Sequence, residues 1–425
     1  MDWVNEIVSE HSELESPRNF WRWAALAAIS AVVKDNIWLD RAGVFKTYPN
    51  IYVMFHADSG LKKGPPVNLA KRLVTKVNNT RIISGRSSIQ GILKEMGTAQ
   101  TSPGGKVNMK SVAFICSSEL SSSIVEDKVA ARILTDLYDR NYNEGDWKSL
   151  LKLENFKLVD PTITMLTATN ESMGEDFITK SVIQGGFIAR TFVIYEKENQ
   201  VNNSLIFPLG KPPDYDSHVN YLKQLSDLKG PFKPLAVTDF DSDYYRHKRM
   251  KFGRDVYFSD AGALYDDWYE EFRKEVKESE FKDETGTMNR FGDSVLKVAM
   301  LLSLSRSPEL IIHPDAVKEA INECEKLVGN ARKTTSGKHG ISSSAQFKHM
   351  IIMELLNRET HQISAEMLMK KTWMHYSSVE EFRDMMESFE QAGIIVSSTM
   401  GNKVLYSMPD KQVEELTRFF KGKRK

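Results

Sequence analysis

Short apolar runs alternate with longer amphipathic stretches between residues 46 and 200. Runs of roughly 4–8 apolar residues indicate buried strands, whereas apolar residues spaced three and four apart indicate helices. Strands that alternate with helices indicate an α/β fold, with a parallel sheet and helices on its faces. The strands predicted in this way are 51–55, 81–84, 112–116, 163–167 and 191–195, and the helices are 67–77, 88–96, 120–138 and 175–182.

The segments on either side of this region have a different pattern. Residues 1–45 form a helical lead-in that ends in a short strand at 37–40, and its main helix is predicted to be capped by Ser16 with Pro17 in the first turn. Residues 259–333 are purely helical, with helices predicted at 261–278, 290–303 and 314–332. Residues 200–256 show no clear period.

A Gly- and Ser-rich segment at 334–344 predicts a linker, and a compact block of about 80 residues follows it. Helices are predicted there at 346–357, from the cap residue Ser364 to Lys371, and at 379–391. A turn at 400–402 then joins strands at 394–396 and 403–406. Three helices followed by a hairpin are the pattern of a winged-helix domain. Such a domain serves either nucleic-acid binding or protein contacts, and both interpretations remain open here.

Composition limits the class of protein. The chain of 425 residues has room for about two to three domains. Its 41% hydrophobic and 27% charged residues are ordinary for a soluble globular protein, and its net charge of zero favours no nucleic-acid or membrane partner overall. The two cysteines, Cys116 and Cys324, give neither a disulfide framework nor metal-ligand spacing, which fits a reducing cytoplasm. The early acidic residues argue against a signal peptide, and the apolar stretch 24–33 is too short to cross a bilayer.

The strand at 51–55 leads into the most informative segment of the chain. Small residues follow the strand, then Lys62 and Lys63, and then two prolines that open a helix. A strand, a lysine-bearing loop and a helix N-terminus are the arrangement that holds a triphosphate, because helix N–H groups and the lysine charge face the phosphates. A plain surface turn is the alternative interpretation. The candidate phosphate-binding residues are Asp58, Ser59, Gly60, Leu61, Lys62, Lys63 and Gly64.

This loop departs from the pattern G-x-x-x-x-G-K-[ST]. Ala57 replaces the first glycine and Lys62 the second, and Gly64 occupies the position of the Mg²⁺-binding hydroxyl. The apolar strand that starts at residue 111 ends in Ser118 and Glu119. Glu119 could polarise an attacking water, and Ser118 then stands where a Mg²⁺-ligating aspartate is expected. A helix N-terminal carboxylate, favoured by the helix dipole, is the alternative for Glu119.

Two further polar residues follow or precede predicted strands. Asn170 follows the strand at 163–167, where its side chain can orient the attacking water. Arg190 directly precedes the strand at 191–195, where an arginine can stabilise the transferring phosphoryl group, often from a neighbouring subunit. Each residue alone is an ordinary polar residue, and their order and spacing are what point to a nucleotide hydrolase.

The order of these motifs resembles the AAA+ ATPases, particularly the minichromosome-maintenance-like helicases. Residues 83–93 are similar to their Gly-x-x-x-Ser-x-x-Gly-Leu segment, Asn170 matches their sensor-1 asparagine, and residues 189–192 resemble their arginine finger. Arg290 lies in a helical region like that of their sensor-2 arginine. The chain also resembles phage and mobile-element replication ATPases, which carry a Ser-Gly-x-x-Lys-Gly loop and a Leu-Tyr-Asp segment, here 137–139.

The resemblance covers about residues 20–330 and implies an order of domains along the chain. It implies an N-terminal helical segment (1–45), a P-loop ATPase core (46–258) and a helical lid (259–333), before the linker and the winged-helix domain (345–425). It further implies a homo-hexameric ring that binds ATP and Mg²⁺ between subunits. Lys63 would hold the phosphates, Glu119 would polarise water and Asn170 would position it, Arg190 would act in trans and Arg290 would act from the lid.

The resemblance also suggests DNA contacts. The segment 97–110 is predicted to form a hairpin, and an insert at this place projects into the DNA channel of the resembling helicases. Lys106 and Lys110 are therefore candidate contacts, with a surface turn as the alternative. Lys371 and Lys403 are the candidates in the winged-helix block. The basic cluster 246–251 could contact phosphates or form a solvated face.

Together these features predict an ATP-dependent DNA helicase or translocase that acts in replication of a phage or mobile element. We expect it in the cytoplasm of a bacterial host, on single-stranded or forked DNA and not on a membrane, with a separate primase or loader as a possible partner. The alternative is a non-hydrolysing P-loop scaffold that binds DNA, because the loop hydroxyl and the aspartate expected to bind Mg²⁺ are both absent.

Overall fold

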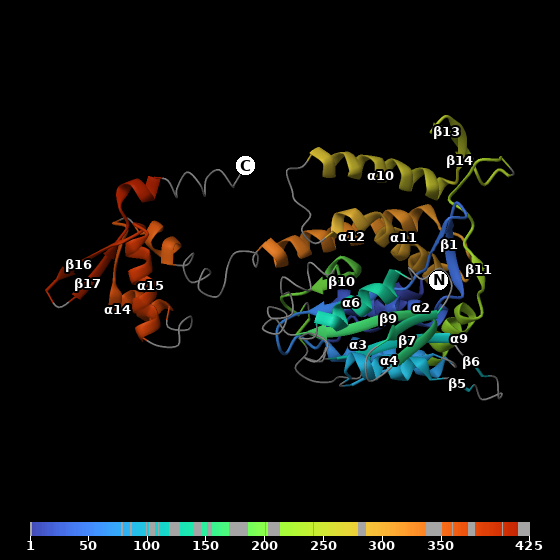
Figure 1. Cartoon of the computed structure of the whole chain (residues 1–425), viewed down its shortest axis with the longest axis horizontal. Coiled ribbons are helices and arrows are strands. Elements are labelled where there is room, and N and C mark those ends of the chain that lie inside the picture. Colours follow the sequence, from blue (N-terminus) through green and yellow to red (C-terminus); the bar gives the residue numbers. More distant parts are fainter. Residues whose placement is uncertain are drawn as a thin grey trace. The chain divides into compact units, whose positions relative to one another are not determined.

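The computed structural model of the chain forms two compact units, Met1–Arg332 and Lys333–Lys425, which are described separately (Figure 1). Among the described residues, no helix is sufficiently long and apolar to cross a lipid bilayer. The structure describes residues 2–77, 80–85, 87–98, 100–101, 107–108, 110–118, 128–139, 146–150, 155–169, 186–199, 201–202, 213–240, 242–278, 286–336, 351–358, 360–372, 379–401 and 403–414.

A parallel sheet forms the centre of the first unit. Its strand order is β10-β3-β9-β7-β4, and every neighbouring pair in this order is parallel. The short strand β8 (Asp146–Leu150) pairs antiparallel with the beginning of β9. The predicted α/β fold with a parallel sheet is therefore confirmed. The bounds are β3 (Tyr52–His56), β4 (Arg81–Ile83), β7 (Lys110–Ser117), β9 (Asn155–Thr169) and β10 (Thr191–Tyr195).

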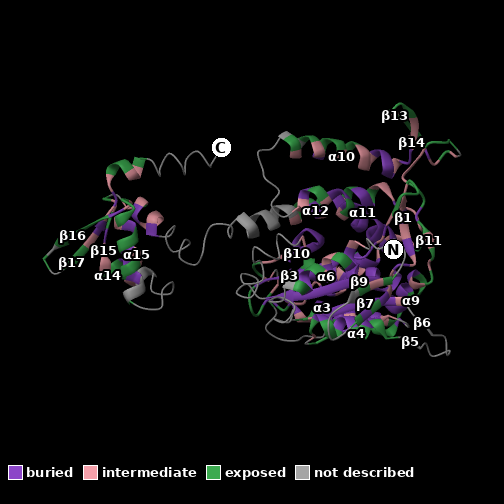
Figure 2. Ribbon diagram, viewed as in Figure 1, coloured by how far each residue is buried: buried purple, intermediate pink, exposed green. Residues whose placement is uncertain are grey.

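Helices cover both faces of this sheet. Successive residues of a strand point to opposite faces, so each strand contributes side chains to the hydrophobic clusters on both sides. In β3, Val53 and Phe55 belong to one hydrophobic cluster, whereas Tyr52 and Met54 belong to another. The first cluster contains residues of α2 (Arg18–Val33) and α3 (Gly64–Lys76). The second contains residues of α4 (Ile89–Gly97) and α6 (Lys128–Asp139). Strands β3, β7 and β10 are almost entirely buried, and so is helix α2 (Figure 2).

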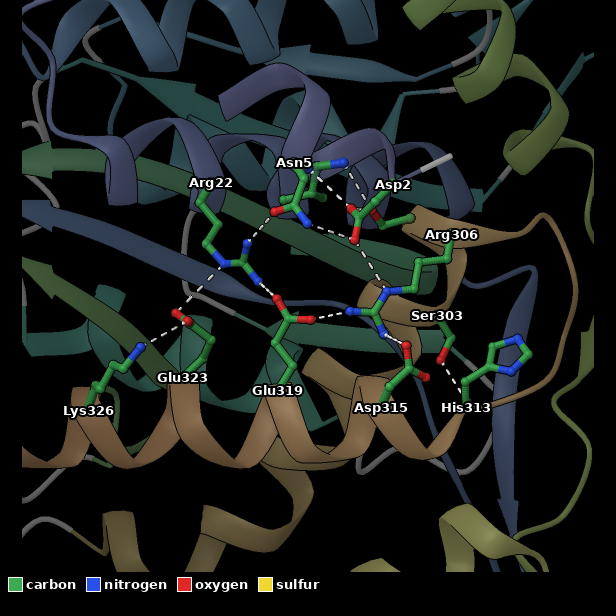
Figure 3. A network of polar contacts seen from close by, with 12 residues as sticks. Asp2, Asn5, Arg22, Ser303, Arg306, His313, Asp315, Glu319, Glu323 and Lys326 are labelled. Carbon is green, nitrogen blue, oxygen red and sulfur yellow. Dashed lines mark hydrogen bonds and ion pairs between the residues drawn. The ribbon is translucent and has the colours of Figure 1, made fainter. Parts of the chain in front are cut away.

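A polar network joins the N-terminal helices to the helices late in the unit (Figure 3). Arg22 of α2 binds Glu319, which also binds Arg306. Arg306 in turn lies 3.3 Å from the carboxylate of Asp2 and 2.7 Å from that of Asp315. These contacts hold α1 (Trp3–Glu10), α2, α11 (Thr287–Arg306) and α12 (Pro314–Ser336) together.

Smaller strands and two more helices complete the unit. The region 200–256, which gave no clear pattern, contains α9 (Tyr215–Ser226) and short strands. The basic cluster 246–251 lies mainly on β13. Its side chains form ion pairs with acidic residues of β14 and α10, so the cluster is a solvated face with paired charges. The remaining elements are β1 (Ile37–Arg41), β2 (Phe45–Thr47), β5 (Gln100–Thr101), β6 (Val107–Asn108), β11 (Gly230–Pro231), β12 (Ala236–Val237), β13 (His247–Lys251), β14 (Arg254–Phe258) and α10 (Asp260–Glu278).

The second unit contains helices and a three-stranded antiparallel sheet. Residues 351–356 are helical, and α14 (Ala365–Thr372) and α15 (Val379–Gln391) follow. The hydroxyl of Ser364 accepts a hydrogen bond from the N–H of Met367 at 3.2 Å, which confirms the predicted cap. The predicted hairpin is also present, as β16 (Val396–Met400) and β17 (Lys403–Ser407). An additional strand, β15 (Gln362–Ser364), pairs with β17.

Several predictions were wrong or incomplete. The N-cap of α2 is Pro17 and makes no side-chain cap, because the Ser16 hydroxyl donates instead to the carbonyl of Lys62. The strand predicted at 163–167 is only the end of the longer β9, and β8 was not predicted. Helix α12 continues to Ser336, into the predicted linker. The helix predicted at 175–182 and the first part of that at 120–138 lie outside the described residues.

Candidate nucleotide-binding site

The loop between β3 and α3 has the backbone of an anion-binding turn. Gly60 has φ +96° and Lys62 has φ +46°, so the chain enters the left-handed region twice within the loop. Such turns direct successive N–H groups into one concavity, which suits an anion. Asp58, Ser59 and Gly60 are exposed, and a ligand can reach this part of the loop.

Lys63 folds back over the loop. Its Nζ donates to the carbonyl of Ala57 at 2.6 Å and to that of Asp58 at 2.8 Å, and the residue is 9% exposed. An ammonium held by carbonyl oxygens at a helix N-terminus can exchange them for phosphate oxygens. Lys63 therefore lies beside the loop that it would help to close around a phosphate.

The helix start provides fewer donors than a usual phosphate-binding helix. Helix α3 begins at Gly64, and Pro65 and Pro66 occupy its first turn. Proline suits this position because of its fixed φ, but it has no N–H. The N–H groups that can face an anion are therefore those of the loop, Lys63 and Gly64, and the helix dipole adds a favourable field.

The N-terminal segment supports the loop from outside. The Ser16 hydroxyl donates to the carbonyl of Lys62 at 2.7 Å, and the Lys62 ammonium lies 4.0 Å from the carboxylate of Glu15. The first contact fixes the peptide that precedes Lys63. The sequence reasoning missed this role because Ser16 was assigned to the adjacent helix, and no local signal connects it to a residue so far along the chain.

The other strand ends meet the loop at the same edge of the sheet. His56 is in register with Thr169 of β9, and Thr167 is in register with Ser117 of β7. Asn170 comes directly after β9 and Glu119 comes two residues after β7, but both lie outside the described residues. Strand β9 lies between β3 and β7, so the Glu119 strand is not the immediate neighbour of β3.

Glu196 is a further acidic residue at this edge, and the sequence analysis missed it. It follows β10, and its N–H donates to the carbonyl of His56 at 3.2 Å. Its carboxylate accepts a hydrogen bond from Asn19 at 2.5 Å. Partial burial raises the pKa of the Glu196 carboxyl, against the opposing effect of the Asn19 hydrogen bond. A carboxyl next to β3, with a raised pKa, could have been suspected only from the strand pairing.

The residues at this edge suit a phosphate better than a protein-bound metal. Across the described part of the chain, no group of three or more His, Cys, Asp and Glu side chains could hold a metal ion. Ser118 is exposed at the end of β7, and Gly64 offers no side chain.

The predicted arginines lie in a second place, a pocket of about 290 Å³ that we call the arginine pocket. Arg190 donates to the carbonyl of Gly186 at 2.8 Å and forms an ion pair with Asp139. Arg290 of α11 contacts the other oxygen of the Asp139 carboxylate at 3.0 Å. Lys297, also of α11, lines the same pocket. The two arginines, far apart in the sequence, therefore share one carboxylate.

Lys297 is the most deeply buried cation of the pocket. Its Nζ donates to both oxygens of Asn50, at 3.0 Å and 2.7 Å, and lies 4.0 Å from the centre of the Tyr138 ring. The pKa of Lys297 is lowered to about 7, mainly by burial and in smaller part by Arg190 and Arg290, while the carboxylates of Asp139 and Asp293 oppose the change. Burial also raises the pKa of the Tyr138 phenol.

The arginine pocket lies at the edge of the sheet formed by the amino ends of β3 and β10. The Lys63 loop lies at the opposite edge, formed by the carboxyl ends of the parallel strands. Arg190 precedes β10 and Asn50 precedes β3, and these parallel strands pair in register from Thr191 and Tyr52. A strand rises about 3.3 Å per residue, so Asn50 and Ala57 lie roughly 20 Å apart. Neither arginine can reach the loop of its own chain. Arg290, which was expected to act from the lid, lies in this structure at the end of the strands opposite to the loop of its own chain.

The predicted DNA contacts are only partly described. Within the segment predicted as a hairpin, β5 pairs antiparallel with β6, and Lys106 lies outside the described residues. Lys110 forms an ion pair with Asp35 at 2.6 Å, which engages its ammonium within the chain. In the second unit Lys403 is exposed on β17. Lys371 lies on α14, and its side chain is outside the described set.

Comparisons with known proteins identify no family. No protein-family model matches the chain, and no curated protein matches it.

Proposed function

We propose that this protein is an ATP-driven DNA helicase or translocase of the AAA+ type, which acts in replication of a phage or mobile element. One observation carries the proposal: a lysine-bearing loop with an anion-binding backbone and a pair of arginines occupy opposite edges of one parallel sheet. An active site that needs both parts is completed only when the loop edge of one copy meets the arginine edge of another.

The loop chemistry supports nucleotide binding. Lys63 and the loop N–H groups would hold the phosphates, and Glu119 and Asn170 would act on the attacking water from the neighbouring strand ends. ATP supplies the phosphoryl group whose transfer to water releases the free energy for movement. Arg190 and Arg290 would stabilise charge on that group from the adjacent copy, which favours a ring, and a hexamer in the AAA+ proposal.

The second unit supports a nucleic-acid role. Its helices and antiparallel hairpin are consistent with a winged helix, in which the hairpin is the wing. Lys403 is exposed on this hairpin and would contact a DNA phosphate. A primase or a loader would be a separate protein.

A specific observation favours a second candidate function, a non-hydrolysing scaffold that binds nucleotide and DNA. Gly64 gives no hydroxyl for Mg²⁺, and no metal-holding cluster exists among the residues that the structure describes. Such a scaffold would bind ATP through Lys63 without turnover.

ATP turnover in the presence of single-stranded DNA separates the two candidates. We expect wild-type protein to hydrolyse ATP faster with DNA, and Lys63→Ala and Arg190→Ala each to lose this activity. Arg254→Ala, at an exposed arginine of β14 and outside the parallel sheet, is the matched control. DNA binding without any turnover by the wild type would favour the scaffold.

Mixing the two inactive variants tests the shared site. In an equal mixture, about a quarter of the interfaces combine an intact Lys63 with an intact Arg190, so about that fraction of wild-type turnover should return. A mixture as inactive as its components would contradict a site formed between copies.

A further inference from the structure

Strand β16 forms an exposed edge of the antiparallel sheet in the second unit. The strand order of this sheet is β15-β17-β16, so β16 has a neighbouring strand on one side and an open edge on the other. Residues 396–399 are all exposed, and Val396 is 52% exposed (Figure 2). An edge strand presents a row of backbone N–H and C=O groups with which a further strand can pair.

Hydrogen bonds within the sheet show which backbone groups point to the open edge. The N–H of Met408, directly after β17, donates to the carbonyl of His361 at 3.0 Å, on the side of β15. Backbone groups of successive residues alternate between the two sides of an antiparallel strand, so those of Leu405 face β16 instead. Leu405 is in register with Ser398, whose backbone groups therefore face β17. The two neighbours of Ser398 in β16 consequently direct their N–H and C=O groups to the open edge.

This edge lacks the features that usually protect a sheet from pairing with another chain. Proteins commonly place a lysine, a proline or a β-bulge on an exposed edge. Residues 394–400 contain no charged residue and no proline. The register between β16 and β17 is unbroken from Val396 to Met400, so no bulge twists the edge away. An uncharged segment with several β-branched residues favours further strand pairing.

A second copy of the same strand satisfies this edge. We propose that β16 of one chain pairs antiparallel with β16 of a second copy, about a two-fold axis at Ser398, so that the two sheets become one. In this register Ser397 of each copy lies opposite Thr399 of the other. Both residues direct their backbone groups outward, so each such pair exchanges two hydrogen bonds. Their hydroxyls can also bond across the strands.

The two-fold arrangement brings no like charges together. Within β16 and β17 the only charged residue is Lys403, which is in register with Met400. With strands about 4.8 Å apart and a rise of about 3.4 Å per residue, the backbones of the two Lys403 residues lie roughly 20 Å apart. This separation exceeds the Debye length of about 8 Å at physiological salt, so their repulsion is screened. Because β16 is short, the contact is small and depends on chain concentration.

Disulfide formation in the full chain tests the proposed register. In Ser398→Cys the two new thiols lie opposite each other, with Cβ atoms about 5 Å apart, which a disulfide can bridge with a small adjustment. Ser397→Cys is the matched control, because it is equally exposed but places the two thiols on diagonal positions roughly 8 Å apart. The native cysteines are buried. Under mild oxidation Ser398→Cys should give about fivefold more linked dimer than Ser397→Cys. Equal yields, or more dimer from Ser397→Cys, would overturn the proposal.

Hydrogen exchange of the unsubstituted chain gives a second test that no folding defect can obscure. The amides of Ser397 and Thr399 should exchange about tenfold more slowly at high than at low chain concentration. The amides of Val396 and Ser398, which face β17, are the internal control and should not change. Fast exchange of Ser397 and Thr399 at every concentration would refute the pairing. Protection that appears only after single-stranded DNA is added would assign the edge to DNA and also refute it. Neither measurement uses nucleotide, so an absence of ATP turnover would refute the proposed function alone.

Discussion

Gly186 is the residue at which the position of Arg190 can be tested most directly. It has φ +71°, in the left-handed region, and its carbonyl accepts a hydrogen bond from Arg190 at 2.8 Å. A Cβ atom at this position would lie 2.7 Å from Nη1 of the same arginine. Gly186→Ala therefore strains the backbone and also pushes the guanidinium away from its partners.

The two effects have different magnitudes. A left-handed conformation costs a residue with a Cβ about 1–2 kcal/mol. Displacing Arg190 weakens a buried, charge-assisted hydrogen bond and its ion pair with Asp139, which adds about 2–3 kcal/mol. We expect Gly186→Ala to lower the free energy of unfolding of the first unit by roughly 3–5 kcal/mol in total.

Gly43→Ala is the matched control, because Gly43 has φ +70° and no atom lies within 4 Å of its added Cβ. This variant carries the backbone strain alone and should lose about 1–2 kcal/mol. Urea unfolding followed by tryptophan fluorescence measures both, since every tryptophan except Trp373 belongs to the first unit. Equal losses in the two variants would refute the argument that Gly186 is required by the position of Arg190.

Three further predictions follow from single contacts. Ser16→Ala removes the hydrogen bond to the Lys62 carbonyl, worth about 1 kcal/mol, and should weaken ATP binding about fivefold in a calorimetric titration. Ser12→Ala, at a half-buried serine whose hydroxyl donates only to the nearby Ser9 carbonyl, should not weaken it. Burial raises the pKa of the Cys116 thiol to about 12 and also raises the pKa of the Cys324 thiol. Neither thiol should therefore react with a thiol reagent at pH 8 before the protein unfolds. Rapid labelling of the native protein would contradict this prediction. Lys297 has a pKa of about 7 when folded and an ordinary value of 10.5 when unfolded, so the unfolded chain binds more protons between these values and stability should rise with pH there. The gain between pH 7 and pH 9 should be about 2 kcal/mol and should be absent in Lys297→Met, as urea midpoints at both pH values would show.

The strands of the sheet were predictable because each is a short apolar run bounded by turn residues. The strand predicted at 191–195 matches β10, and that at 51–55 differs from β3 by one residue. The hairpin and two helices of the second unit were also predicted, since Gly393 and Gly401 mark the turns. The pattern failed where pairing is not local: β8 and α9 are short or amphipathic, and tertiary contacts determine them.

The candidate site divides in the same way. The sequence by itself determined the lysine loop after β3 and the arginine before β10, because both are tied to the ends of predicted strands. It did not determine that Arg190 and Arg290 share Asp139, or that Ser16 supports the loop. These contacts join residues far apart in the chain, and nothing in the local pattern encodes them.

Only the tertiary structure decided which groups can act together. Parallel strands carry the residues that follow them to one edge of a sheet and the residues that precede them to the other. The residues after β3 and before β10 are therefore separated by the length of a strand. The sequence specified the chemical groups and their strands, and the parallel pairing of those strands placed the lysine and the arginines on opposite edges.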